Sequence, residues 1–418
     1  MTDFVADDSG NAAASRPSAR PPGPLRLALV TRRYPPLIGG AEKLLRYLAE
    51  ALAREGADVT VLTSRAPGTE HEPRHEERTW DGPHGLGRLS VVRLPTVPFR
   101  FVGTWLYMNH LRGWLESHSY DLAYVSMLKH DAYVAIGVGR RRGFPVVLRP
   151  EGAGATGDIT WQNWANFGRR IAARCREADA FVAISRTIAR ELEEAGYDRT
   201  RIHQLPNGVP VPEAPWQPRP GWREAPRGVF VGRLAGEKGL STLIESWALV
   251  RAAHPRATLT LVGDGPEREA ILTQAQARGL DVGAGRAVEL RGPMRDVEPV
   301  LRASDLFILP SLEEGMSIAL LEAMALGIPL VATAIPGNRR LIGDYKHGRL
   351  VAPGDPVALA RTIQEQWADF DRAFHMSRVA RRRVENEFSI ATVARAHLTL
   401  FEHLRQCKRG ASERIRVV

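Results

Sequence analysis

Cysteine is scarce in this sequence, which has only Cys175 and Cys407 among 418 residues. Two thiols so far apart have no metal-ligand spacing and cannot build a disulfide framework, which excludes a zinc ribbon and a disulfide-stapled secreted domain. Aromatic residues make up 7% of the chain, and neither a Cys/His finger nor an RNP-like aromatic strand occurs. We therefore expect a cytoplasmic protein without a nucleic-acid partner.

Long hydrophobic runs are also missing. The best candidate for a membrane span, residues 316–335, contains Glu322 and is interrupted by Gly327 and Pro329. This pattern favours a buried helix, a turn and a buried strand over a membrane span. Residues 1–24 lack the basic and apolar regions of a signal peptide and are rich in Ala, Ser and Pro, which predicts a disordered tail.

Positive charge is in excess, because 57 Lys and Arg face 47 Asp and Glu, for a net charge of +10. Such an excess favours an anionic partner, for example a phosphate-bearing small molecule or an anionic membrane surface. The content of hydrophobic residues, 44%, and of charged residues, 25%, is ordinary for globular proteins. The length predicts two or three domains.

Short β-rich apolar runs alternate with helical patterns from residue 25 onward. This alternation predicts an α/β fold with two doubly wound, Rossmann-like domains, over residues 25–206 and 227–385. Seven prolines in or next to residues 207–226 predict an extended linker between them. Residues 386–418 are expected to form a helix that packs back toward the first domain, followed by a tail. Two such domains face each other across a cleft at the carboxyl ends of their strands, where ligands bind.

Two loops of the predicted sheets have features of phosphate sites. Gly39 and Gly40 stand between the first strand and the first helix, where backbone N–H groups can approach an anion, although a plain tight turn also fits. Arg233 and Lys238 follow a strand of the second domain and precede a helix. These two cations can hold a diphosphate without a metal, or they pair with Glu237 on the surface.

The strongest group of candidate residues lies around the next apolar helix. Glu314 precedes that helix, and Glu322 lies inside it among apolar residues. A lone carboxylate there needs a partner, either the two hydroxyls of a ribose or a buried arginine. The backbone N–H groups of Gly315, Met316 and Ser317 suit phosphate or sugar oxygens.

These motifs together resemble a known family, the family 4 retaining glycosyltransferases of the GT-B fold (glycosyltransferase group 1). The resemblance covers about residues 25–404 and implies transfer of a sugar from a nucleotide-sugar donor, UDP- or GDP-linked, with no metal or other cofactor. The acceptor it implies is a lipid-linked sugar, a polysaccharide or a small molecule. The motifs occur in this order: Gly39-Gly40-Ala41-Glu42, Asn207-Gly208-Val209, Val231-Gly232-Arg233-Leu234 with Lys238-Gly239, Val262-Gly263-Asp264-Gly265-Pro266, and Glu314 seven residues before Glu322.

The resemblance also implies roles for individual residues. Arg233 and Lys238 would bind the donor diphosphate, Glu322 the ribose, and Glu314 would lie near the transferred sugar. Backbone contacts to the donor would come from Gly39, Gly40 and the segment Gly315-Met316-Ser317.

The sequence departs from the family pattern at two positions. Many members have a histidine where this chain reads Arg149-Pro150-Glu151, so we expect Glu151 to take that place in an active-site loop over residues 149–158. Arg340 replaces a commonly acidic residue, which predicts a more cationic environment for the donor phosphates.

Two other functions are also compatible with the sequence, a nucleotide-sugar epimerase of the same architecture and a non-catalytic binding protein. The motif Asp369-Phe370-Asp371 matches a metal signature of other glycosyltransferases, but it falls late in a helical stretch, so we predict no metal site there.

The acceptor is expected to bind the first domain. Residues 100–118 place apolar side chains at helical spacing among basic residues. This helix either packs its stripe on the sheet or lies on an anionic membrane, which would make the protein peripheral on the cytosolic face. The stripe consists of Phe101, Trp105, Met108, Leu111 and Leu115.

Overall fold

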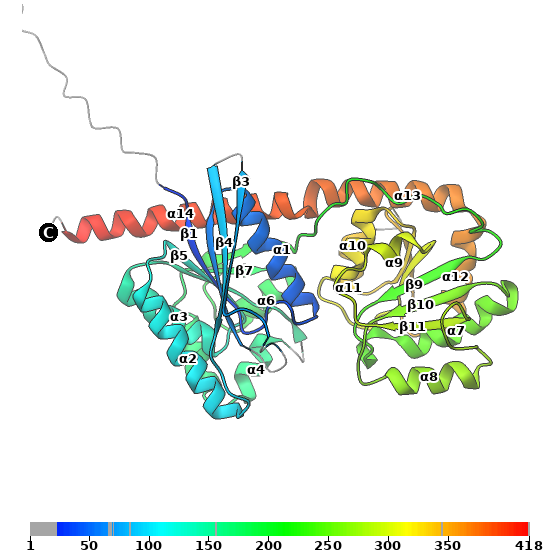
Figure 1. Ribbon diagram of the computed structural model, residues 1–418, viewed down its shortest axis with the longest axis horizontal. Coiled ribbons are helices and arrows are strands. Elements are labelled where there is room, and N and C mark those ends of the chain that lie inside the picture. The colour runs from blue at the N-terminus through cyan, green and yellow to red at the C-terminus, as the bar shows by residue number, and fades with distance from the viewer. Residues whose placement is uncertain are drawn as a thin grey trace, which may run out of the picture.

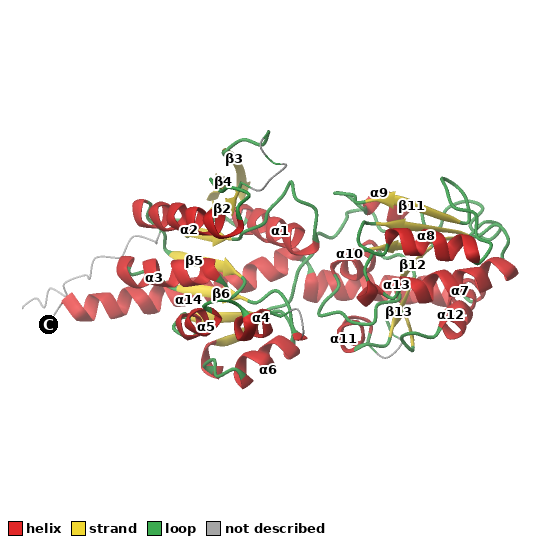
Figure 2. Ribbon diagram, turned by 90° about the horizontal axis from the view of Figure 1, so that it is seen from below, coloured by secondary structure: helices red, strands yellow, loops and turns green. Residues whose placement is uncertain are grey.

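The computed structural model describes residues 23–65, 69, 71–82, 85–154, 157–343 and 346–416. Over these ranges the chain forms two α/β units that lie side by side (Figure 1). Each unit has a mainly parallel sheet with helices on both faces (Figure 2). The predicted fold class, two doubly wound domains, is therefore confirmed. The tail predicted over residues 1–24 lies, apart from its last two residues, outside the described ranges.

The first sheet has the strand order β3-β4-β2-β1-β5-β6-β7-β8. Successive residues of β1 enter opposite cores: Leu27 and Leu29 pack on one face, and Ala28 and Val30 on the other. Burial on both faces explains why the central strands are apolar along their whole length. The strands are β1 Arg26–Val30, β2 Asp58–Ser64, β3 His75–Gly82, β4 Gly85–Leu94, β5 Leu122–Ser126, β6 Val146–Arg149, β7 Ala180–Ala183 and β8 Ile202–Gln204. The helices are α1 Gly40–Arg54, α2 Arg100–Ser117, α3 His130–Arg142, α4 Asp158–Trp164, α5 Gly168–Cys175, α6 Arg186–Glu194 and the 3-10 turn Arg199–Arg201.

The edge of the first sheet differs from the prediction. A strand was expected only over residues 90–94, whereas β4 is twice as long and pairs with β3 in an antiparallel hairpin. The sequence of β3, HEERTWDG, is mostly polar, and none of its residues is buried. An edge strand without an apolar face leaves no hydrophobic pattern to detect.

The second sheet has the order β11-β10-β9-β12-β13-β14, with parallel neighbours. The direction of winding changes between β9 and β12, and in the first sheet it changes between β1 and β5. Ligands of doubly wound sheets bind at such points, beyond the carboxyl ends of the strands. The strands are β9 Arg227–Val231, β10 Thr258–Val262, β11 Val288–Gly292, β12 Leu306–Leu309, β13 Leu330–Thr333 and β14 Arg349–Val351. The helices are the 3-10 turn Gly236–Lys238, α7 Leu240–Ala253, α8 Arg268–Ala277, α9 Glu298–Arg302, α10 Ile318–Leu326, α11 Pro336–Ile342, α12 Pro356–Ala368 and α13 Phe370–Arg383.

The proline-rich segment between the sheets is extended but not detached. Trp216 is fully buried in the core of the second domain, and its indole N–H donates to the carbonyl of Ser304 at 2.9 Å. Trp222 stacks on Phe370 with ring centroids 4.0 Å apart. The tryptophans therefore fasten this segment along the second domain.

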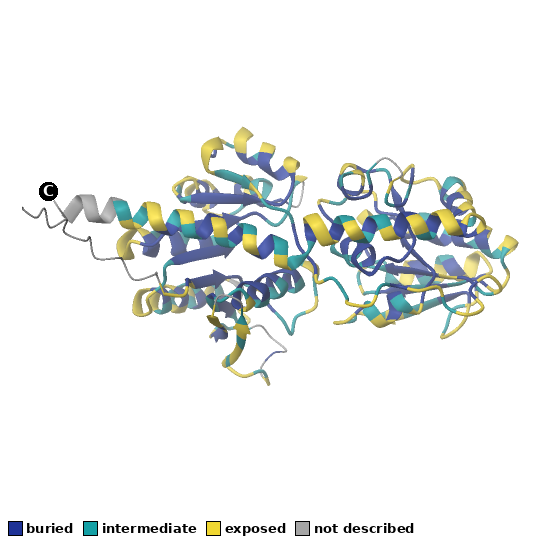
Figure 3. Cartoon of the chain, turned by 90° about the horizontal axis from the view of Figure 1, so that it is seen from above, coloured by how far each residue is buried: buried dark blue, intermediate teal, exposed yellow. Residues whose placement is uncertain are grey.

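The C-terminal part of the chain returns to the first domain. After α13 and the π-helical segment Val384–Phe388, helix α14 (Ile390–Arg416) runs along the first sheet, so that α13 and α14 together pass over both domains (Figures 1 and 3). Phe401 is buried in the core of the first domain, and the Tyr124 hydroxyl lies 3.2 Å from Nε2 of His397. The backbone N–H of Val209 donates to Phe388, so the two crossing segments also bond to each other.

Candidate active site

The carboxyl edges of the two sheets meet around the N-terminus of α10. A Cβ placed on Gly40, at the start of α1, would lie 2.7 Å from Cδ1 of Ile318. A Cβ on Gly154, in the loop after β6, would lie 3.2 Å from the carboxylate of Glu313. The loops after β1 and β6 therefore face the loop after β12, as two doubly wound domains require.

Lys238 and Glu314 are brought together by two bonded loops. Gly239 has a φ of 63°, and a Cβ there would overlap the carbonyl of Pro310. Only glycine accommodates both this backbone conformation and this approach. The Leu312 N–H donates to the carbonyl of Glu237 at 2.8 Å, which ties the loop after β12 to the turn before α7.

The two predicted phosphate-binding cations differ in their partners. Nζ of Lys238 lies 2.6 Å from Oε1 of Glu314, which also accepts a hydrogen bond from the Ser311 hydroxyl at 3.0 Å. Among the described residues, the exposed guanidinium of Arg233 forms no ion pair. Neither cation pairs with Glu237, so this alternative is not what the structure shows. At this edge of the second sheet, Arg233 thus has no ion-pair partner among the described residues, whereas Lys238 is paired with the carboxylate of Glu314.

The start of α10 offers backbone donors beside these cations. The Ser317 hydroxyl caps the helix by accepting from the N–H of Leu320 at 3.3 Å. Gly315 is exposed, and a Cβ there would meet no atom within 4 Å. The N–H groups of Gly315, Met316 and Ser317 donate to no carbonyl of the described chain. A helix start of this kind favours an anion.

The carboxylate of Glu322 has partners from the other domain. Its Oε1 lies 2.5 Å from Nζ of Lys43 and accepts a hydrogen bond from the Tyr47 hydroxyl at 3.0 Å. Burial, together with the carboxylate, raises the pKa of Tyr47 well above its usual range. The expected alternative of a buried arginine is wrong, because the partner is a lysine of α1. Glu322 lines an inter-domain cavity of about 110 Å³ with Lys43, Tyr47 and Leu301.

Sequence reasoning missed Lys43 and Tyr47. They are four residues apart, just after the Gly39–Gly40 loop, so a shared helix face was readable from the sequence. That this face meets α10 depends on how the two domains are placed.

Gly39, which was predicted to contact the donor, has extended backbone. A Cβ there would overlap the carboxylate of Glu42, which is ion-paired with Arg33 at 2.5 Å.

Glu151 lies at the end of β6 in a buried polar network. Its Oε1 accepts from the Ser126 hydroxyl at 2.6 Å and from the guanidinium of Arg149, which also donates to Asn207 at 2.7 Å. The Glu151 N–H donates to Asp158 at 2.9 Å. Residues 155 and 156 of the predicted active-site loop lie outside the described ranges. The network anchors the loop that faces Glu313.

Arg340 is directed at the first domain. One of its guanidinium nitrogens donates to the carbonyl of Ile184 at 3.2 Å. Burial and the neighbouring charge of Arg186 lower its pKa. The arginine therefore bridges the two domains, which differs from the expected place beside the donor phosphates.

The apolar stripe of α2 is divided between core and surface. Leu111 and Leu115 are fully buried with Tyr107, whereas Phe101 and Trp105 are exposed by 73% and 65%. The prediction that the whole stripe forms one face with a single environment is therefore wrong. Its C-terminal half packs on the sheet, and its N-terminal half forms an exposed aromatic end.

The two facing doubly wound domains, with cations and a helix start at the second sheet, define the GT-B class of enzymes. Comparison with known families agrees: residues 38–212 match the model "Glycosyltransferase Family 4", and residues 225–369 match "Glycosyl transferases group 1". The chain therefore belongs to the family 4 glycosyltransferases of the GT-B fold and is a glycosyltransferase.

Known proteins similar to this chain include several that build sugars or polysaccharides. A glycogen synthase of Mycobacterium tuberculosis is 27% identical over 426 residues, covering 94% of this chain and 98% of its own. The solved sucrose-phosphate synthase from Thermosynechococcus elongatus has a TM-score of 0.72 at 21% identity, over 92% of this chain and all of its own. Anabaena HepE, solved in complex with UDP and glucose, has a TM-score of 0.70 at 19% identity, over 90% of this chain and 99% of its own. These similarities do not favour the epimerase or the non-catalytic protein.

None of the described helices combines the length and the apolar character that crossing a bilayer requires.

Proposed function

We propose that this glycosyltransferase moves a hexosyl group from a UDP- or GDP-linked sugar to its acceptor with retained anomeric configuration and without a metal ion. The proposal rests on one observation: the guanidinium of Arg233, beside Lys238 and the start of α10, has no ion-pair partner among the described residues. The complex of the similar HepE with UDP and glucose supports a nucleotide-sugar donor.

The donor diphosphate is the group that these charges suit. As the bond between the anomeric carbon and the diphosphate oxygen breaks, negative charge grows on the leaving group. Arg233, Lys238 and the N–H groups of Gly315–Ser317 stabilise that charge more in the transition state than in the ground state. Because an ammonium group has three donors, Lys238 can contact phosphate while it keeps its bond to Glu314.

The acceptor hydroxyl attacks the same face of the sugar from which the diphosphate leaves. A bond forms between the acceptor oxygen and the anomeric carbon, the bond to the diphosphate breaks, and the acceptor proton passes to a leaving phosphate oxygen. Glu314 lies near the transferred sugar and orients Lys238. Glu151 acts as a positioning residue, because its Oε1 is already shared by Ser126 and Arg149.

The ribose of the donor takes the place that Lys43 and Tyr47 occupy at Glu322. A carboxylate accepts hydrogen bonds from two vicinal hydroxyls, so the diol replaces one ammonium and one phenol. Donor binding therefore exchanges an inter-domain contact for a contact with the ligand.

The acceptor side is the first domain, and the proposed acceptor is a lipid-linked sugar or a polysaccharide. The exposed end of α2 supports work at an anionic membrane surface on the cytosolic side. Its apolar side chains, exposed by 56% to 73%, are Phe99, Phe101, Val102 and Trp105. Aromatic residues on a cationic protein are typical of interfacial binding.

The proposal is tested by calorimetric titration with UDP, GDP, ADP and dTDP, each with and without EDTA. Selective binding of UDP or GDP that survives EDTA supports a metal-free donor site. Loss of binding with EDTA would contradict metal independence. Incubation of the donor without acceptor distinguishes an epimerase, which would convert the sugar, and NMR of the product anomer tests retention.

A further inference from the structure

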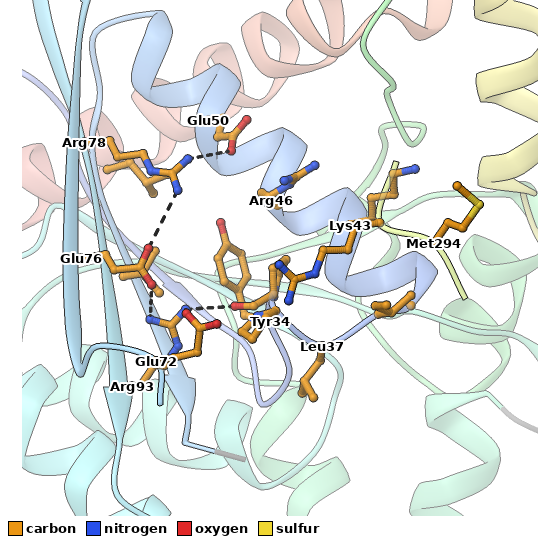
Figure 4. A pocket seen from close by; sticks show the side chains of 17 residues that line it. Tyr34, Leu37, Lys43, Arg46, Glu50, Glu72, Glu76, Arg78, Arg93 and Met294 are labelled. Atoms are coloured by element: carbon orange, nitrogen blue, oxygen red, sulfur yellow. Dashed lines mark hydrogen bonds and ion pairs between the residues drawn. The ribbon is translucent and has the colours of Figure 1, made fainter. Parts of the chain in front are cut away.

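A cavity of about 200 Å³ lies next to the proposed donor site, with which it shares Gly39 and Lys43, behind the loop that follows β1. Its walls come from that loop, from α1, from the β3–β4 hairpin and from the segment after β11 in the second domain (Figure 4). Gly39 lines the cavity, and its neighbour Gly40 faces Ile318. The loop therefore separates the cavity from the start of α10.

The three glutamates of this cavity form ion pairs with two arginines, Arg93 and Arg78. Arg93 is only 5% exposed; it lies 2.5 Å from Glu76 and 3.9 Å from Glu72, and it donates to the carbonyl of Pro35 at 3.1 Å. Arg78 lies 4.0 Å from both Glu50 and Glu76. These three glutamates are thus already paired within the wall (Figure 4).

Other polar groups of the cavity have no such partner. The Tyr34 hydroxyl and Nε of Arg46 are buried without a hydrogen-bond partner, and Tyr34 is only 6% exposed. The ring of Tyr34 points into the space between α1 and the β3–β4 strands (Figure 4). Neither Arg46 nor Arg295 forms an ion pair with a described carboxylate. A buried donor without an acceptor is unfavourable, so these groups indicate a missing acceptor.

We infer that this cavity is a second ligand site, which binds a small molecule through an oxyanion, phosphate or carboxylate, held between Arg46 and Arg295. Guanidinium groups are well suited to bind both kinds of oxyanion. The Tyr34 hydroxyl donates a further hydrogen bond to the ligand. Apolar side chains of Leu37 and Met294 supply a surface for the body of the molecule.

The position of the cavity gives the ligand a structural effect. Arg46 belongs to the first domain and Arg295 to the second, so an anion between them joins the domains on the far side of the Gly39 loop. An anion that contacts both guanidinium groups bridges the two domains by charge-assisted hydrogen bonds. Binding at this site is therefore expected to favour the closed arrangement in which Gly40 meets Ile318.

The test is calorimetric titration of the full chain with inorganic phosphate, glucose 6-phosphate and glucuronate, with uncharged glucose as the reference. We expect at least one of the three anions to bind and glucose not to bind. Binding should weaken at least tenfold in Arg46→Gln and in Arg295→Gln, and about threefold in Tyr34→Phe. Arg291→Gln is the matched control, because Arg291 is nearby in sequence, pairs with Glu289 at 2.8 Å and does not line the cavity.

The variant Arg233→Gln distinguishes anion binding at the proposed donor site from anion binding in this cavity. Anion binding that survives in Arg233→Gln but is lost in Arg295→Gln supports the second site, whether or not the nucleotide proposal holds. Binding that is lost in Arg233→Gln and unchanged in Arg46→Gln and Arg295→Gln overturns it, as does the absence of binding of all three anions. Arg295 is exposed on a loop, so its variant keeps the test valid if Arg46→Gln unfolds.

Discussion

Nζ of Lys43 and Oε1 of Glu322 lie 2.5 Å apart, although the two residues belong to helices of different domains. Each side chain is less than a fifth exposed, so the pair is partly shielded from water. In such surroundings an unpaired carboxylate is costly, and any ligand that separates the pair must replace its hydrogen bonds. In the proposed donor complex the two ribose hydroxyls replace them, which would link donor binding to the contact between the domains.

Glu322→Gln tests that exchange. We expect nucleotide affinity to fall about tenfold or more, because hydrogen bonds to a charged group contribute roughly 1.5–3 kcal/mol. The loss should vanish for a 2′,3′-dideoxynucleotide, which has no diol to bind. Calorimetric titration of both nucleotides against wild type and variant measures this, with the exposed Glu313→Gln as the control. Equal losses for the two nucleotides would remove Glu322 from the ribose site.

Arg233→Ala and Lys238→Ala test the diphosphate contacts. Each should weaken nucleotide binding by about 1.5–3 kcal/mol, or roughly 10- to 150-fold. Lys238→Ala also leaves Glu314 without its cation, so its thermal unfolding must be measured beside the titration. Arg291→Ala removes a paired arginine elsewhere on the same domain and should leave the affinity as it is. Unchanged affinity in both site variants would contradict the assignment.

Glu314→Gln should act on turnover more than on binding. Losing the carboxylate frees Lys238 for the diphosphate, so donor affinity is preserved, but the ammonium and the sugar lose their alignment. We expect kcat to fall about 100-fold with little change in the donor Kd, a pattern that marks an interaction of the transition state. Steady-state kinetics and a parallel nucleotide titration measure the two effects. Wild-type kcat in the variant would exclude Glu314 from the reaction.

The sequence was sufficient for the fold because the central strands are apolar runs buried on both faces. The residues of the proposed donor site were also readable, since Arg233 follows strand β9, and Lys238 and Glu314 precede helices α7 and α10. By contrast, the polar strand β3 had no hydrophobic pattern to reveal it. The partner Tyr47 of Glu322 is 275 residues away along the chain, so only the placement of the domains identifies it.

The exposed end of α2 should bind anionic membranes. A variant with Phe99→Ser and Trp105→Ser should lose most co-sedimentation with anionic liposomes at low salt, because these side chains supply the buried apolar area. Leu86→Ser is the control, since Leu86 is 64% exposed but lies at the other end of β4 from α2. Retained sedimentation of the double variant, or none for wild type, would remove the membrane from the proposal.

His397 should make the stability of the protein sensitive to acid. Its Nδ1 lies 2.8 Å from the carbonyl of Val393, which only accepts, so Nδ1 carries the proton and Nε2 accepts from the Tyr124 hydroxyl. Burial lowers the pKa of His397 from its usual 6.5 to about 4. The native imidazole thus stays neutral where the unfolded chain takes up a proton. Its contribution to stability is complete above pH 6.5 and is lost as the pH falls toward 4, by up to about 3 kcal/mol.

Asp131 changes the stability in the opposite direction over an overlapping pH range. The pH profiles of the variants are therefore compared with that of wild type. Burial raises the pKa of Asp131 from 3.8 to about 6, and stability from this group is lost as the pH rises through that window. Urea unfolding at pH 4.5, 5.5, 6.5 and 7.5 should show that His397→Gln loses less free energy of unfolding on acidification than wild type does. Asp131→Asn should lose more. Parallel pH profiles for wild type and His397→Gln would show that His397 is not the group that titrates, whatever the stability of the variant at neutral pH.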